Sequence, residues 1–192
     1  MSTAPKRYIT PEEYLEIERN AKFKSEYFNG EMFAMAGGSR IHGLIATNVI
    51  GELRNQLRGR PCMVYNSDVR VHIAATGLYA YPDVSVVCGE TTAEQETDVV
   101  TNPLVIVEVL SASTKDYDRG QKFEQYRKLI SLREYLLISQ HEPHVEQYIR
   151  QEGAEWLFRE RYDPNDVVTI AALDCTLPLR EIYDKVTFPT QQ

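Results

Sequence analysis

Two acidic residues lie in stretches of sequence that are otherwise typical of buried strands. Glu108 stands inside the apolar, β-branched run from Leu104 to Leu110, and Asp83 stands between Pro82 and Val84 at the start of another such run. Continuous runs of this kind favour strands that are covered on both faces. Because an ionised carboxylate is costly to bury alone, each acid should be paired, hydrogen-bonded, neutralised or bound to a cation.

A shared divalent metal ion would stabilise both acids, because Mg²⁺ and Mn²⁺ prefer hard oxygen ligands with room for water. Lys122 lies on the helix expected after Glu108, and a lysine stem can reach back to the end of a strand. Two carboxylates, a metal and an ammonium group suit phosphodiester hydrolysis, in which the metal activates water and the amine stabilises charge. The residues leave a second interpretation open, in which Asp83, Glu108 and Lys122 form a buried ion pair that only stabilises the core.

The elements that must position these residues follow from capping signals and hydrophobic periodicity. Asn29-Gly30 predicts a hairpin within residues 25–36, and Ser39 predicts the start of a helix. The predicted helices are about 10–19, 39–58, 117–130 and 179–183. The predicted strands beyond the hairpin are 63–73, 81–87, 103–110, 134–139, 144–150, 155–161 and 167–170, with residues 89–102 as an exposed acidic connector.

Two further residues occupy positions from which they could join a site. His42 falls in the first turn of the helix after a Gly-Gly-Ser entry, and Glu31 opens the second strand of the hairpin. A lone helix histidine is more often structural or exposed than functional, so both interpretations of His42 stay open.

Composition restricts the class of protein. The 192 residues, 43% hydrophobic and 26% charged, predict one soluble globular domain with an ordered core of about residues 8 to 188. The formal net charge of −7 argues against non-specific coating of nucleic acid, but it allows a local basic groove. We find no signal peptide and no apolar run of about 20 residues, so a cytoplasmic protein without a membrane segment is expected. Cys62, Cys88 and Cys175 are predicted to be reduced core thiols.

Three stretches in sequence order resemble the Uma-type restriction endonuclease family. They are Y-P-D-V-S-V-V at 81–87, P-L-V-I-V-E-V-L-S at 103–111 and D-R-G-Q-K-F-E-Q-Y at 118–126. The similarity extends to Asn29-Gly30-Glu31, to G-S-x-x-H at 38–42 and to S-L-R-E-Y at 131–135. The resemblance implies the PD-(D/E)-x-K nuclease core. The expected fold is therefore α/β and restriction-endonuclease-like, with a central mixed sheet flanked by helices 39–58 and 117–130 and preceded by the N-terminal helix and β-hairpin.

The resemblance also implies roles for individual residues. Asp83 and Glu108 are the expected ligands of Mg²⁺ or Mn²⁺. The motif asks for lysine two positions after Glu108, where this chain has Leu110. Similar proteins supply the amine from the following helix, which indicates Lys122, with Lys115 in the loop as the weaker substitute. Glu31 is expected as an acid for a second metal and His42 as an assisting residue.

The sequence therefore predicts a Mg²⁺- or Mn²⁺-dependent DNA endonuclease. Fold analogy adds a homodimer, because two sites related by a two-fold axis can address both strands of a duplex. The cations expected near DNA phosphates are Arg40, Arg54, Arg58, Lys115, Arg119 and Arg127. Two alternatives remain: a catalytically inactive nuclease-like module that binds DNA or protein, and a metal-dependent phosphatase with a closed pocket for small molecules.

Overall fold

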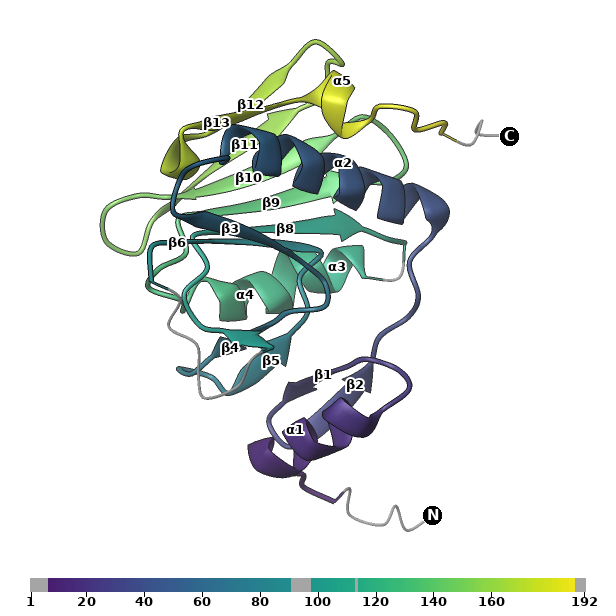
Figure 1. The fold of residues 1–192 in the computed structure, drawn as a ribbon, viewed down its shortest axis with the longest axis vertical. Coiled ribbons are helices and arrows are strands. Elements are labelled where there is room, and N and C mark those ends of the chain that lie inside the picture. Colours follow the sequence, from purple (N-terminus) through teal and green to yellow (C-terminus); the bar gives the residue numbers. More distant parts are fainter. Residues whose placement is uncertain (1–6, 91–97, 113, 189–192) are drawn as a thin grey trace.

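The fold is built on a six-stranded sheet that carries both strand acids. In the computed structural model, which describes residues 7–90, 98–112 and 114–188, the chain ends expected outside the ordered core lie outside the described residues. The sheet strands are β3 (Cys62–Asn66), β6 (Val84–Cys88), β8 (Val105–Leu110), β9 (Glu134–Ser139), β10 (Val145–Arg150) and β11 (Trp156–Arg161). Their spatial order is β11-β10-β9-β8-β6-β3, in which β8 and β9 pair in parallel and the other neighbours pair antiparallel (Figure 1). The predicted mixed central sheet is confirmed.

One face of this main sheet is covered by a long helix and the C-terminal elements. These are α2 (Arg40–Gln56), β12 (Val167–Ile170), a 3₁₀ turn (Ala171–Leu173), β13 (Cys175–Pro178) and α5 (Leu179–Ile182). Ile45, Val49 and Leu53 recur at helical spacing and are fully buried against the sheet. The sequence did not predict β13, which pairs with β12 in a separate two-stranded ribbon.

The other face of the main sheet is covered by a helical segment and then by a second sheet. The helical segment comprises α3 (Lys115–Tyr117), a π-helical turn (Asp118–Lys122) and α4 (Phe123–Tyr126). The second sheet has the order β2-β1-β5-β4-β7, formed by β1 (Ser25–Phe28), β2 (Glu31–Ala34), β4 (Arg70–Ile73), β5 (Leu78–Ala80) and β7 (Val99–Val100). Buried residues from both sheets and from α4 share one core, so α4 packs together with both sheets.

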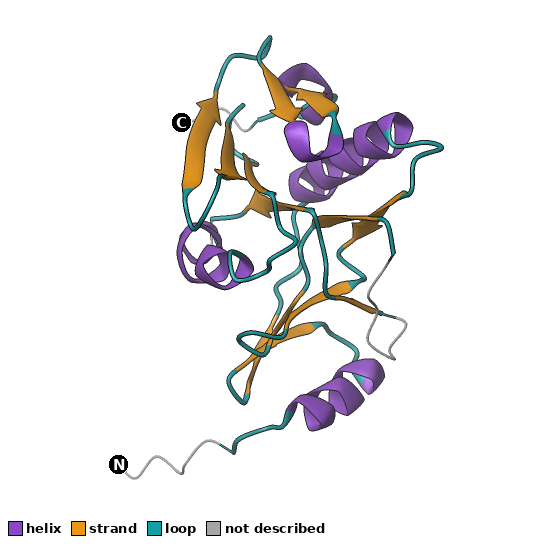
Figure 2. Cartoon of the chain, turned by 90° about the vertical axis from the view of Figure 1, so that its left-hand side faces the viewer, coloured by secondary structure: helices purple, strands orange, loops and turns teal. Residues whose placement is uncertain are grey.

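The outer side of the second sheet packs against α1 (Pro11–Asn20) through Tyr14, Tyr27 and Tyr79. Figure 2 shows α1 near the N-terminus, separated by strands from the helices that cover the main sheet. Thr10 caps α1 with the reciprocal Glu13 hydrogen bonds of a capping box. In the described part of the chain, no helix is long and apolar enough to span a bilayer.

Two predicted segments differ from the structure. Residues 63–73 do not form one strand, because a turn after Asn66 ends β3 and sends β4 into the second sheet. The predicted exposed connector 89–102 lies partly outside the described residues, and its end forms the buried strand β7, which pairs with β4. Asp98 there forms an ion pair with the buried side chain of Arg70.

The helix predicted for 117–130 is also shorter and less regular. It begins at Lys115, contains the π-helical turn and ends at Tyr126. Phe123 and Tyr126 are buried, but Ile130 is 88% exposed because the chain has left the helix by that point.

The prediction of three reduced thiols is wrong for two of them. Cys62 and Cys88 face each other across the β3–β6 ladder and form a disulfide, so the pairing register brings together residues 26 positions apart. Cys175 is a free, buried thiol, as predicted.

Candidate active site

Asp83 lies immediately before β6 and extends the hydrogen bonding of that strand with its side chain. Pro82 precedes it and has no N–H to donate. From the neighbouring strand β8, the Val109 N–H donates to the side-chain oxygen Asp83 Oδ2 at 2.7 Å. The Asp83 N–H in turn points to Glu108 Oε2 at 3.4 Å. Local backbone pairing therefore places the two carboxylates side by side.

Glu108 lies in the interior, at 4% exposure, and its two oxygens face different partners. Oε1 accepts from the Tyr126 hydroxyl at 3.0 Å and lies 2.9 Å from Lys122 Nζ. Burial raises the pKa of Glu108 well above its usual range, while the Lys122 ammonium opposes that shift. A partner was expected for this carboxylate, but the Tyr126 hydroxyl was not predicted as one.

Lys122 supplies an amine where Leu110 cannot. Glu108 and Leu110 are two residues apart in β8, so their side chains lie on the same face, the one that α4 covers. Leu110 packs there in the apolar core. The helical segment over the same face carries Lys122, whose Nζ also lies 3.0 Å from Glu26 Oε1 and 3.8 Å from Asp118 Oδ1. Burial alone would lower the pKa of Lys122, and these surrounding carboxylates together raise it, so the amine stays an ammonium.

Glu26 and Asp118 were not predicted as site residues. Asp118 was visible in the sequence as the i, i+4 neighbour of Lys122, a spacing that brings side chains together on a helix. Glu26 gave a weaker signal, a charged residue in the short alternating strand before the Asn29-Gly30 turn. Its contact with Lys122 depends on the packing of the second sheet against α4.

His42 joins the site from the main-sheet side. Ser39 caps α2 by accepting from the His42 N–H at 3.1 Å, and it donates to Gln140 Oε1 at 2.6 Å beyond the end of β9. A Cβ on Gly38 would lie 2.8 Å from His42 Nδ1, so the glycine leaves room for the ring. His42 Nε2 lies 3.1 Å from Asp83 Oδ2, and this hydrogen bond raises the pKa of His42 against the opposing effect of burial.

Glu31 and Lys115 are placed less directly. Glu31 pairs with Phe28 in the hairpin ladder, so it lies on the same face of the hairpin as Glu26. It is partly buried, and its predicted role with a second metal stays a prediction. Lys115 is exposed at the start of α3, whereas Lys122 is the lysine in contact with Glu108.

The interior around Lys122 holds more carboxyl groups than amines. The carboxylates of Glu26, Glu108 and Asp118 surround the ammonium group, and Asp83 lies beside Glu108. A divalent cation held by Asp83 and Glu108 would offset this excess. No group of three or more His, Cys, Asp or Glu side chains within the described ranges is arranged as metal ligands. The donor set fits Mg²⁺ or Mn²⁺ through two carboxylates, because Mg²⁺ commonly takes its other ligands from water and phosphate.

The site opens to solvent on the side of Asp83 and His42, whose side chains are 14% and 18% exposed. Tyr117, 36% exposed, lies close enough to the buried acids for their charge to act on it. Burial, together with the neighbouring Glu26 carboxylate, raises the pKa of Tyr117 to about 12. Of the predicted DNA-facing cations, Arg119 is bound to Glu146 at 2.5 Å, and the others are exposed.

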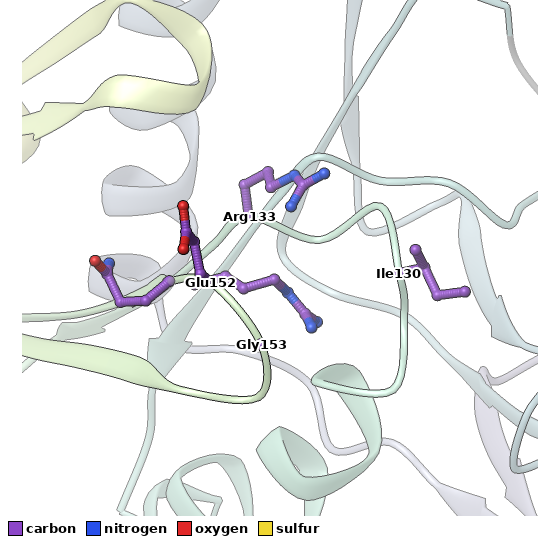
Figure 3. A pocket seen from close by; sticks show the side chains of 6 residues that line it. Ile130, Arg133, Glu152 and Gly153 are labelled. Atoms are coloured by element: carbon purple, nitrogen blue, oxygen red, sulfur yellow. The ribbon is translucent and has the colours of Figure 1, made fainter.

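A surface hollow with a volume of about 550 Å³ lies away from these residues (Figure 3). Ile130 and Arg133 line it beside the start of β9, together with Arg150 and the β10–β11 turn. Glu108 lies farther along the sheet, where it pairs with Leu137 of β9. The guanidinium of Arg150 already donates to the carbonyls of Arg127, Leu129 and Leu132. This hollow is therefore distinct from the candidate active site.

Comparison with known proteins identifies the family. The Uma2 family model, described as "Putative restriction endonuclease", matches residues 11–180. The chain belongs to the Uma2 family. The chain is 36% identical over 186 residues to the uncharacterized protein slr1290 of Synechocystis, a match that covers 97% of each chain. It is 37% identical over 166 residues to the uncharacterized Synechocystis protein sll1609, covering 86% of this chain and 94% of the relative.

A solved structure shares the fold of this Uma2 chain. A putative nuclease belonging to DUF820 from Anabaena variabilis superposes with a TM-score of 0.75 at 17% sequence identity. The match covers 93% of this chain and 99% of the other. The predicted α/β nuclease-like fold is confirmed.

Proposed function

We propose that this Uma2 protein is a Mg²⁺- or Mn²⁺-dependent DNA endonuclease that hydrolyses phosphodiester bonds. The observation that carries the proposal is the 2.9 Å contact of Lys122 Nζ with Glu108 Oε1, which provides an amine despite Leu110. Membership of a family described as "Putative restriction endonuclease" and a fold shared with a structure described as a putative nuclease support the substrate class.

The proposed roles follow from the contacts of each residue. Asp83 and Glu108 would hold the metal, which when bound would lower the pKa of a water molecule and polarise the phosphoryl oxygen. The ammonium of Lys122 stabilises the charge that develops on the attacked phosphate. His42, hydrogen-bonded to Asp83 on the solvent side, orients that carboxylate and holds a proton near the reacting groups.

The route of DNA to the site is part of the proposal. The exposed Arg40 at the start of α2 and Lys115 at the start of α3 contact phosphates, and Glu31 serves a second metal. The homodimer remains a prediction from fold analogy, which light scattering after size-exclusion chromatography would test.

The test is cleavage of supercoiled plasmid with Mg²⁺, with Mn²⁺ and with EDTA. We expect metal-dependent nicking by the wild type, with none from Asp83→Asn or Glu108→Gln, because each loses a charged ligand. Lys122→Met keeps the stem volume, and we expect it to lower the rate by about 10²–10³-fold, the usual cost of one charge-stabilising group. Lys22→Met, at an exposed lysine outside the site, is the matched control.

Two outcomes would contradict the proposal. Wild-type rates in Glu108→Gln would exclude this site, and cleavage in EDTA would exclude the metal. A wild type that shifts DNA in a gel without cleaving it with either metal would favour the nuclease-like binding module.

A further inference from the structure

The N-terminal hairpin sends one carboxylate into the candidate active site. Glu26 lies in β1, is 7% exposed, and its Oε1 is 3.0 Å from Lys122 Nζ. Alternation along β1 explains this direction. Tyr27 packs on the α1 side of the second sheet, whereas Glu26 and Phe28 point to the side that meets α4.

Glu26 is also held by the chain that leads to Asp83. The Tyr81 N–H donates to Glu26 Oε1 at 3.3 Å, two residues before Asp83. The Tyr81 hydroxyl donates to Glu18 Oε1 of α1 at 3.0 Å, and that oxygen also accepts from the Ser25 N–H. Tyr81 is thus in contact with both Glu18 and Glu26, and of these two acids Glu26 is the one in contact with Lys122.

The contacts of Lys122 show what Glu26 can do. An ammonium group has three donors, and here the short contacts are with Glu108 Oε1 at 2.9 Å and Glu26 Oε1 at 3.0 Å. These acids belong to opposite sheets, so the amine is held between them. Asp118, at 3.8 Å, is the remaining acceptor and lies on the helical segment of Lys122 itself. Without the Glu26 charge, the amine would be free to turn toward Asp118 and away from its place against Glu108.

We propose that Glu26 is a positioning residue of the active site, which holds the Lys122 ammonium against Glu108 from the second sheet. The contact stands on the geometry, and its effect on catalysis rests on the proposed function. The inference gives the N-terminal α1–β1–β2 unit a part in the site, although its strands belong to the second sheet and not to the main sheet.

The contact is tested by a double-mutant cycle in urea unfolding, which needs no activity. We expect Glu26→Gln to lower the urea midpoint in the wild-type background and to have little further effect in Lys122→Met, because the partner is then gone. Glu18→Gln is the matched control, since Glu18 is a buried acid of the same unit that binds Tyr81 and Ser25. It should lower the midpoint equally in both backgrounds. An equal effect of Glu26→Gln in both backgrounds would overturn the proposal.

The catalytic consequence is tested by the kinetics of plasmid cleavage with Mn²⁺. Glu26→Gln should lower kcat by about 10–100-fold, the usual effect of removing a residue that orients a catalytic group. KM for DNA should stay near the wild-type value. Glu26→Asp keeps the charge and should recover part of kcat, whereas Glu18→Gln should cost stability and leave kcat near the wild-type value.

The outcomes separate the two proposals. A cleaving wild type with an unaffected Glu26→Gln variant would overturn the positioning role and leave the endonuclease standing. If the wild type cleaves no DNA, the endonuclease fails, and the unfolding cycle alone decides whether Glu26 positions the lysine.

Discussion

Glu108 is kept in the interior by three donors, two from the helical segment after β8 and one from the residue that precedes β6. The amine of Lys122, the hydroxyl of Tyr126 and the N–H of Asp83 all point to its two oxygens. A carboxylate that loses one of these donors inside the protein cannot replace it with water at no cost, so each donor contributes to stability as well as to position.

The contribution of the hydroxyl can be measured with Tyr126→Phe. We expect this change to lower the free energy of unfolding by about 1–3 kcal/mol, because Glu108 Oε1 keeps its charge environment but loses a buried donor. Chemical denaturation measures the effect. Tyr148→Phe is the control, since that hydroxyl makes a longer, 3.4 Å contact with Glu146 from a partly buried position. If both variants lost the same free energy of unfolding, the hydrogen bond from Tyr126 to Glu108 would contribute no more to stability than the longer contact of Tyr148.

The residues of the site differ in how far the sequence could reveal them. Asp83 and Glu108 were visible because a charge within an apolar run contradicts the local composition. Lys122 was found from its place on the helix after Glu108 and His42 from the Gly-Gly-Ser entry of its helix, and the structure places Lys122 against Glu108 and His42 against Asp83. Glu26 could not be found in this way, because its contact joins positions 26 and 122 through packing of two sheets that no local pattern records.

At the scale of elements, the helical segment after β8 matters most. Its π-helical turn, a rare conformation often found at functional sites, begins at Asp118 and ends at Lys122. Both end residues are buried, at 4% and 5% exposure, while Arg119 between them turns out to Glu146. The segment thus presents an acid and an amine to the sheet together.

Elements with a strong local pattern were predicted, and those that depend on distant partners were not. The strands β9, β10 and β11 match the predicted runs closely. The stretch 63–73 alternates throughout, but its two halves pair with different sheets, which only the tertiary contacts determine. The short strand β7 likewise exists because β4 lies beside it.

The Cys62–Cys88 disulfide joins the edge strand β3 to β6, and we expect it to stabilise this edge of the main sheet. Reduction, or Cys62→Ser with Cys88→Ser, should lower the free energy of unfolding by about 3 kcal/mol, because the open chain regains the freedom of a loop of this length. Thermal unfolding with and without dithiothreitol measures this loss. Dithiothreitol should not affect the double serine variant, in which Cys175 is the remaining cysteine. No shift on reduction of the wild type would contradict the structural role of the bond.

At the scale of the whole molecule, the buried carboxyl groups should make the stability of the fold depend on pH and on the binding of a divalent cation. Burial is the main cause that raises the pKa of Glu108 and of Asp118 above their usual values. At pH values between its unfolded-state pKa and its folded-state pKa, each of these carboxyl groups binds more protons in the folded protein than in the unfolded chain. Its contribution to stability is therefore fully present at low pH and is lost as the pH rises from about 4 through the raised folded pKa.

A bound divalent cation favours the ionised carboxylates and should recover that loss. We expect Mn²⁺ to raise the thermal unfolding midpoint more at pH 8 than at pH 5. Glu134→Gln should keep this difference, because Glu134 is a buried acid with a raised pKa that binds Gln147 and Ala172 away from the site. Glu108→Gln should abolish it. An equal metal effect at both pH values would contradict the linkage.

The place of Lys122 between two sheets also decides when the site can exist during synthesis. Glu26, Asp83 and Glu108 are all made before the lysine, on a ribosome that adds about 5–20 residues per second. Until the segment after β8 has been made and has packed, the acids of the two sheets have no ammonium between them. A chain that stops before residue 122 carries the acids proposed to bind the metal without the amine. On the proposed function, a nascent or truncated copy is therefore silent toward DNA until most of its length has been translated.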